Sequence, residues 1–371
     1  MKITIERTAL LKSLGHVQSV VERRNTIPIL NNVKIEVADG RLSLNATDMD
    51  LDIVEQLDAE VGTAGATTAP AHTLYDIVRK LPDGSQVELT ADGNGQVVLR
   101  SGRSRFTLAC LPTDDFPVMS GGDLPHNFTL SAADLRTIID RTRFAISTEE
   151  TRYYLNGIYL HAAKNEKTDV LRAVATDGHR LASVEVALPE GAKDMPGVIL
   201  PRKMVTEVRK LIDEIEGDVG IALSETKVRV TLGDGVLTSK LIDGTFPDYE
   251  RVIPAGNDKT LTVDRKLFTN AVDRVSAISA EKSRAVKMAL SDGILTLSVS
   301  SPDAGSATEE LEVGYKGESI EIGFNARYLL DITQQITGEN TEFVMNDAAS
   351  PTIVRDVDDP SAIYVLMPMR V

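Results

Sequence analysis

Hydrophobic residues along the chain repeatedly switch from alternating spacing to helical spacing. Alternation is typical of a half-buried strand, and spacing of three or four residues is typical of an amphipathic helix. A strand followed by a helix is therefore predicted at three places. These are KITIERTALLKSLGHVQSVV from Lys2, NFTLSAADLRTIIDRTRFAIS from Asn127 and TLTVDRKLFTNAVDRVSAIS from Thr260.

The helical part of each segment has its own apolar face. In the third segment we expect Leu267, Ala271, Val275 and Ile278 to be buried. In the second, Ser131 followed by Asp134 resembles a capping box at the start of the helix.

A second strand-to-helix transition lies midway through each third of the chain, at Pro70, Pro201 and Asn325. Proline suits a first helical turn, whose N–H would lack a partner in any case. Six such units, two per third, predict an α+β fold of three similar domains, each with two helices on antiparallel sheet. The predicted domains are residues 1–125, 126–257 and 258–371, and the predicted helices are residues 6–24, 72–80, 131–143, 202–213, 264–274 and 325–335.

Turn signals divide the β-rich stretches between these helices. Asp-Gly occurs at 39–40, 92–93, 234–235 and 292–293, and this pair is a strong hairpin signal. DMDLD at 48–52 has the alternate acids of a calcium loop, but Ile53 stands where the glycine of that loop belongs. Apolar residues alternate with the acids, which favours a half-buried strand.

Length and composition argue against a membrane-spanning, secreted or disulfide-rich protein. A chain of 371 residues favours two or three domains, and no window has the ~18 apolar residues of a membrane span. The start, MKITIERTALL, lacks the features of a signal peptide, and the single cysteine excludes an intramolecular disulfide framework. A cytoplasmic location is the expectation.

Charge is unevenly distributed along the chain. The net charge is −15, from 40 basic and 55 acidic residues, yet the six predicted helices together carry +7. The remaining sequence therefore carries −22. Solvated helix faces would explain any one helix, but all six together favour a basic surface on an acidic body. Such a surface attracts duplex DNA without regard to sequence.

Two polar motifs have competing interpretations. Asp177 and His179, in ATDGHRLA, could serve acid–base chemistry, but no nucleophile motif or second histidine lies nearby, so a turn is favoured. SGRSRF places Arg103 and Arg105 close to Arg100, either as a phosphate-contacting loop or as a merely solvated one. No phosphate-binding G-x-x-x-x-G-K-[ST] motif is present, which argues against nucleotide hydrolysis.

The repeated thirds, together with YYLNG, ATDGHRLA, FPDY and MPMR in that order, resemble the bacterial DNA polymerase III beta subunit, the replicative sliding clamp. The resemblance covers essentially the whole chain. It implies a head-to-tail homodimer that forms a six-domain ring around double-stranded DNA and confers processivity. It implies no cofactor, no metal and no catalytic activity.

The resemblance also implies partners and site residues. The apolar last nine residues, IYVLMPMRV, would help to form a cleft that binds short peptides of the replicative polymerase alpha subunit, the clamp loader, other polymerases and repair factors. The cleft residues would be Arg152, Tyr154, Leu155, Thr176, Gly178, His179, Arg180, Leu181, Pro247, Val252, Asn325, Tyr328, Val365, Leu366, Met367, Pro368, Met369 and Arg370. Those for DNA would be Arg24, Tyr153, Tyr154, Arg202 and Lys203, and we add Arg100, Arg103 and Arg105 from SGRSRF.

The chain departs from the family pattern at a few positions. His72, Thr73 and Glu149 replace residues expected to favour DNA, and Ala349 and Pro351, beside Ser350, would change the depth and motif preference of the cleft. Two other hypotheses compete with a clamp. One is an enzyme that uses Asp177 and His179, and the other is an interaction scaffold that never meets DNA.

Overall fold

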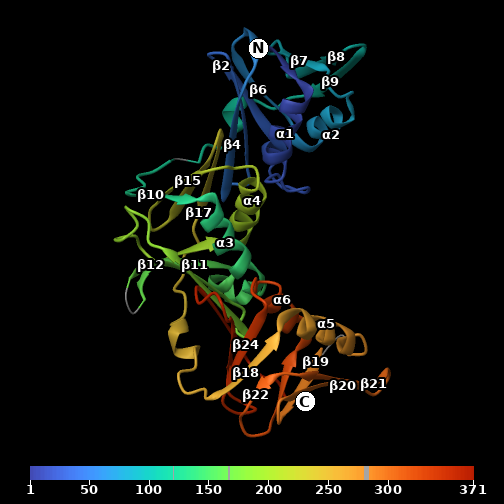
Figure 1. Cartoon of the computed structure of the whole chain (residues 1–371). Helices are drawn as coiled ribbons and strands as arrows, with labels where there is room; N and C mark the ends of the chain where they lie inside the picture. Colours follow the sequence, from blue (N-terminus) through green and yellow to red (C-terminus); the bar gives the residue numbers. More distant parts are fainter. Residues whose placement is uncertain (120, 166–167, 280–283) are drawn as a thin grey trace. The chain divides into compact units, whose positions relative to one another are not determined.

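The computed structural model describes residues 1–119, 121–165, 168–279 and 284–371 (Figure 1). The chain forms two compact units. Unit 1 comprises Met1–Leu135, Pro189–Pro196 and Lys203–Leu241, and unit 2 comprises Arg136–Leu188, Gly197–Arg202 and Ile242–Val371. The segment predicted as the middle domain is thus divided between the units, and the three predicted domain boundaries stay a prediction.

Unit 1 contains two antiparallel sheets. The smaller has the strand order β5 (Glu60–Thr63), β1 (Lys2–Glu6), β7 (Gln86–Ala91), β8 (Gln96–Ser101) and β9 (Ser104–Ala109). The larger has the order β10 (His126–Ser131), β15 (Asp218–Leu223), β16 (Lys227–Leu232), β17 (Gly235–Lys240), β4 (Leu51–Asp58), β3 (Arg41–Thr47), β2 (Asn32–Ala38) and β6 (Gly65–Pro70).

Unit 2 also contains two antiparallel sheets. The larger has the order β14 (Val198–Pro201), β11 (Gly157–Lys164), β12 (Asp169–Thr176), β13 (Arg180–Ala187), β26 (Ala362–Leu366), β25 (Thr352–Asp356), β24 (Asn340–Met345), β18 (Lys259–Asp264) and β22 (Gly314–Tyr315). The smaller has the order β21 (Gly305–Glu312), β20 (Ile294–Ser301), β19 (Ala285–Ser291) and β23 (Ile320–Asn325).

All six predicted helices form. They are α1 (Arg7–Gln18), α2 (Ala71–Lys80), α3 (Ala132–Thr142), α4 (Arg202–Ile212), α5 (Arg265–Ser276) and α6 (Ala326–Thr333). In unit 1, α1 lies beside α2 (Figure 1). It also packs against β3 and β4. In unit 2, α5 packs in the same way against α6 and against β20 and β21. The two-helix arrangement predicted for each third is therefore observed twice in separate units.

Local signals account for most helix and turn positions. Ser131 caps the start of α3, because its hydroxyl accepts from the Asp134 N–H at 3.0 Å, while the Asp134 carboxylate accepts from this hydroxyl and not from the Ser131 N–H of a full capping box. All four Asp-Gly pairs lie at hairpins between consecutive antiparallel strands, although Gly235 is already the first residue of β17. At 39–40 and 292–293 both residues have positive φ, as a type I′ hairpin turn requires.

Three local predictions were wrong in detail. The first helix ends at Gln18, because Ser19, Val20 and Val21 donate to carbonyls three residues back instead of four. In DMDLD only Leu51 and Asp52 belong to β4, since Asp48 Oδ1 accepts from the Asp50 and Leu51 N–H groups and so stabilises a turn.

The third incorrect detail concerns the buried face of α5. Leu267 is 58% exposed, while Phe268, Ala271, Val272 and Val275 are buried. The core-facing stripe is therefore rotated by one residue from the predicted stripe at its N-terminal end. Phe268 provides the buried anchor there, with its ring 5.1 Å from that of Phe343.

Candidate functional site

The residues predicted for the cleft all belong to unit 2, and we call this set of 18 residues the candidate peptide site. Its base is an apolar cluster. Leu155, Leu181 and Val365 are each at most 4% exposed, and Tyr154 packs against them while partly exposed. Leu181 and Val365 are opposite each other in the β13–β26 ladder. The cluster is completed by residues that sequence reasoning missed, among them Phe246 and Tyr249.

The turn between β12 and β13 forms one wall of this site. Thr176 and Arg180 close the turn, with the Thr176 hydroxyl donating to the Arg180 carbonyl at 2.7 Å. Gly178 has φ +88°, and a Cβ there would lie 2.7 Å from Nη1 of Arg152. Glycine thus permits both the left-handed turn and the close approach of the guanidinium. Arg152 is held in place by Glu149, whose carboxylate lies 2.7 Å from Nη2.

Arg180 is the most strongly anchored residue of the site. Its guanidinium lies 2.5 Å from a carboxylate oxygen of Asp331 and 3.2 Å from one of Asp177, and it donates to the Phe144 carbonyl at 2.6 Å. Its Cζ atom also lies 4.3 Å from the ring centroid of Tyr328 and 5.1 Å from that of Phe144. These contacts link β13 to α6, and neither Phe144 nor Asp331 carries a local sequence signal.

The C-terminal residues form a second wall. Val365 and Leu366 are buried in β26, whereas Met367 is 41% exposed. The Met367 N–H donates to the His179 carbonyl at 2.9 Å, and the His179 ring stacks on Tyr328. The methionine that follows β26 is therefore held beside the turn with its side chain accessible to solvent.

The other predicted residues of the candidate peptide site differ in their surroundings. Asn325 caps α6 by accepting from the Arg327 N–H at 2.9 Å. Pro247 and Val252 are exposed on the segment around the helical turn Tyr249–Val252, and Arg370 is exposed beyond β26. Pro368 and Met369 are partly buried. The structure thus brings the apolar base, the turn and residues 365–369 together, with Pro247, Val252 and Arg370 exposed.

The Asp177–His179 pair lacks the geometry expected of an acid–base couple. The Asp177 carboxylate accepts from the backbone N–H groups of His179 and Arg180 and lies beside the Arg180 guanidinium. It therefore stabilises the turn that the sequence predicts. A carboxylate that orients a catalytic histidine would instead bond to its ring.

The residues predicted for DNA are mostly exposed. In unit 2, Tyr153 is 54% exposed and packs edge-to-face on Tyr154, and Arg202 is exposed at the start of α4. In unit 1, Arg24 is exposed after α1. Nearby, His72 contacts Gln18 and the Val21 carbonyl, so it links α2 to the end of α1.

Lys203 lies in unit 1 within a group of oxygen atoms. Its Nζ atom is 2.5 Å from a carboxylate oxygen of Glu22, 2.5 Å from one of Asp48 and 3.1 Å from the Val20 carbonyl. Burial disfavours the charged ammonium, but the hydrogen bonds that it donates to the two carboxylates outweigh this effect and raise the pKa of Lys203. Its charge is therefore neutralised within the chain, although it stays a predicted DNA contact.

Arg100, Arg103 and Arg105 are exposed at the edge of the five-stranded sheet of unit 1. Arg105 lies in β9, the last strand of that sheet, and pairs in register with Arg100 of β8. Arg103 lies in the turn between these strands. The structure therefore places the three arginines together on the β8–β9 hairpin, whose second strand is an open sheet edge.

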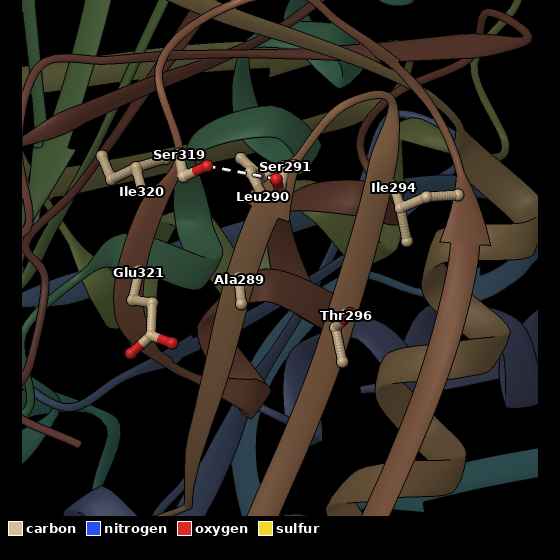
Figure 2. A pocket seen from close by; sticks show the side chains of 8 residues that line it. All are labelled: Ala289, Leu290, Ser291, Ile294, Thr296, Ser319, Ile320 and Glu321. Carbon is tan, nitrogen blue, oxygen red and sulfur yellow. Dashed lines mark hydrogen bonds between the residues drawn. The ribbon is translucent and has the colours of Figure 1, made fainter.

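A further hollow lies outside the candidate peptide site. Strands β19, β20 and β23 carry a shallow hollow of about 220 Å³, where the Ser319 and Ser291 hydroxyls lie 3.1 Å apart (Figure 2). Small and aliphatic side chains dominate its lining, with Glu321 as its one ionisable residue. No cluster of potential metal ligands occurs among the described residues, and none of the described helices could span a membrane.

Comparison with known proteins covers the whole chain. Three family models match, those for the N-terminal, central and C-terminal domains of the DNA polymerase III beta subunit, over residues 1–120, 129–248 and 250–370. The beta sliding clamp of Caulobacter vibrioides is 56% identical over 372 residues, covering 100% of both chains.

Solved structures agree with these matches. The sliding clamp of Bartonella birtlesii bound to griselimycin is 53% identical with a TM-score of 0.98, and that of Pseudomonas aeruginosa bound to griselimycin is 41% identical with a TM-score of 0.95. Each comparison covers 100% of both chains. The chain therefore belongs to the DNA polymerase III beta subunit family, the bacterial sliding clamps.

Proposed function

We propose that two copies of this chain form a closed ring that encircles duplex DNA and tethers a polymerase to it. The observation that carries this proposal is the full-length similarity to sliding clamps across three clamp domains. Enclosure accounts for long residence on DNA without tight adhesion, because a ring must open before circular DNA can leave. Tethering raises the effective concentration of the polymerase at the primer end.

Ring closure requires two complementary surfaces, and two open sheet edges supply them. In unit 1, β9 ends its sheet and lies beside Arg100 and Arg103. In unit 2, β21 ends the four-stranded sheet and carries the exposed residues Glu310 and Glu312, while Glu309 is already paired with Arg274. An exposed edge strand is a template for pairing with another chain. We infer that β9 of one copy pairs with β21 of the other, twice in a head-to-tail dimer.

This arrangement gives the arginines of SGRSRF a partner other than DNA. Opposite charges facing each other across two strand edges would select the correct partner edge. A double variant R103E/R105E is expected to shift the dimer toward monomer in sedimentation experiments. Unchanged dimer mass in this variant would exclude the β9–β21 pairing and favour the original assignment of these residues to DNA.

For DNA we propose contacts from Arg24, Tyr153, Tyr154 and Arg202, all of which are at least partly exposed. Contacts to phosphates attract duplex DNA without reading its sequence, which suits a ring that slides. Lys203 would act indirectly, since Glu22 and Asp48 already neutralise its charge. Its substitution should therefore weaken DNA binding less than that of Arg24.

For the candidate peptide site we propose that short segments of the replicative polymerase alpha subunit, the clamp loader, other polymerases and repair factors bind. A buried apolar base with a methionine at its rim supports this role, because methionine adapts to different ligands. Griselimycin, bound by two of the matched clamps, is a suitable probe. We propose no catalytic activity for this chain, so His179→Ala should weaken peptide binding only.

Release from DNA tests the topological proposal. The protein is loaded by a clamp loader onto a nicked circular plasmid, freed of unbound protein by gel filtration, and the plasmid is then linearised. Retention on the circle followed by loss from the linear form is expected. Equal retention on both forms would exclude enclosure, and an absence of loading on either form would favour a scaffold that never meets DNA.

A further inference from the structure

We propose that Gly323 is a positioning residue of the candidate peptide site, because it provides the space in which the C-terminal segment Met367–Val371 docks. This inference rests on the proposed function of that site in binding peptides. Gly323 lies in the interior of β23, where it pairs in register with Lys287 of β19, and it is buried. A glycine inside a strand often marks the close approach of another backbone.

The backbone that approaches Gly323 belongs to Met369. These two residues form an isolated antiparallel bridge, in which the Met369 N–H donates to the Gly323 carbonyl at 2.9 Å. A Cβ on Gly323 would lie 2.5 Å from the Met369 carbonyl oxygen and 2.3 Å from Cγ1 of Val371. Both distances are shorter than real Cβ contacts, and one of the atoms is backbone, which cannot rotate away.

The C-terminal segment is therefore fixed at two points on two different sheets. The Met367 N–H donates to the carbonyl of His179, which immediately precedes β13, and the Met369 N–H donates to the carbonyl of Gly323 in β23. Pro368 lies between them, where it restricts the backbone and leaves no additional N–H to satisfy. Two bonds on either side of a proline hold the segment in one path. The backbone positions of Met367 and Met369 are therefore fixed beside the site, and their flexible side chains project from these positions.

Substitution of Gly323 should displace the C-terminal segment without disrupting strand β23. Its φ lies outside the left-handed region, so alanine can adopt the backbone conformation without strain. The three atoms nearest to a Cβ on Gly323 all belong to Met369 and Val371. Alanine at 323 should therefore displace the segment from β23 and leave β23 in its sheet.

The test compares three variants with the natural chain: G323A, G323A/V371G and G256A. Gly256 is the matched control, since a Cβ there meets nothing within 4 Å. Griselimycin is titrated calorimetrically against each protein, and the methionine methyl groups are followed by NMR. We expect at least about tenfold weaker binding for G323A, with shifted Met367 and Met369 signals, and no change for G256A.

The double variant separates positioning from a defect of the strand. Removing the Val371 side chain relieves the nearest clash, so G323A/V371G should recover part of the affinity. Natural affinity in G323A, or a folding defect that V371G does not relieve, would overturn the inference. Failure of the natural chain itself to bind griselimycin would instead overturn the proposed peptide site.

Discussion

Each unit contains a seam where strands from distant parts of the sequence join into one sheet, and the two seams differ in their chemistry. The β4–β17 seam of unit 1 pairs Asp52 with Thr238 and Glu55 with Gly235. Ion pairs surround it, including His16 with Glu55 and with Glu214. The β13–β26 seam of unit 2 pairs Leu181 with Val365 and lies over the apolar cluster.

This difference separates a structural role from a binding role. Several polar groups at the β4–β17 seam contact one another, as His16 does with Glu55, and so hold the strands in register, whereas Asp52 Oδ1 is buried without a hydrogen-bond partner. The β13–β26 seam has one anchored charge, Arg180, and partly exposed apolar side chains such as Tyr154 at its rim. Exposed apolar surface with a rigid base is what a peptide needs in order to bind.

The largest expected effect is at the β13–β26 seam. Arg180→Ala should lower the free energy of unfolding by about 3 kcal/mol, because it leaves Asp177 and Asp331 without their buried partner. Urea denaturation measures this loss, and hydrogen exchange in β26 locates it. Lys203→Met is the comparison change in unit 1, outside the β4–β17 ladder, and should cost about 1 kcal/mol, since the Lys203 and Glu22 side chains are 33% and 58% exposed. Equal losses would contradict the comparison.

The next effect is a gain of stability at the β4–β17 seam. Burial raises the pKa of Asp52 to about 6, and a hydrogen bond from Asn45 offsets only part of this rise. The contribution of Asp52 to stability is therefore complete below pH 4 and is lost as pH rises through 6.

Asp52→Asn should consequently stabilise the protein by about 2 kcal/mol at pH 8 and have little effect at pH 4. Urea denaturation at both pH values checks this prediction. A gain of equal size at both pH values would show that ionisation of Asp52 is not its cause. Asn45→Ala serves as a companion variant that should raise the pKa of Asp52 further.

A smaller pH effect is expected from His16. Burial disfavours its charged ring, but the hydrogen bonds and charges of Glu55 and Glu214 outweigh burial and raise its pKa. Its contribution to stability is thus complete below the unfolded pKa and is lost as pH rises through the folded value.

His16→Gln should abolish this loss, and the D52N background removes the overlapping titration of Asp52. Unfolding free energies of D52N and H16Q/D52N are compared from pH 6 to pH 9. Convergence of the two proteins as pH rises is expected. Parallel curves across this range would mean that the His16–Glu55–Glu214 contacts are independent of the charge on the ring.

The smallest effect should come from an exposed pair at the same seam. Arg41 and Asp234 have side chains that are 44% and 70% exposed and lie 2.9 Å apart. Arg41→Gln should cost less than about 0.5 kcal/mol, and high salt should remove even this difference. A loss comparable to that of Arg180→Ala would mean that exposed charges hold the β4–β17 seam.

Local structure was predicted well because its causes are local. Pro70 and Pro201 stand immediately before α2 and α4, and Ser131 caps α3 through residues three positions away. Turns with positive φ at Asp39 and Asp292 follow from Asp-Gly pairs. Each of these signals acts within a few residues, so a single sequence suffices to read it.

The seams and the anchors of the candidate peptide site could not be predicted in the same way. Nothing near Asp331 indicates that its carboxylate meets Arg180, which lies in a different predicted domain. From the sequence, Lys203 is an ordinary basic residue of a helix. Its ion pairs with Glu22 and Asp48 are visible only in the structure. Gly323 lies within an ordinary strand pattern, and the need for glycine there becomes clear only from the close approach of the Met369 backbone. Such features depend on pairing over long sequence distances.

The order of strands at the β13–β26 seam has a consequence for synthesis of the chain on the ribosome. Every residue of unit 1 has been made once Leu241 is joined, so that unit can fold while translation continues. β13 can pair with β26 only after β26 has been translated, which is more than a hundred residues later. Until then its edge and Leu181 stay uncovered in the nascent chain, where chaperones or a wrong strand could bind them.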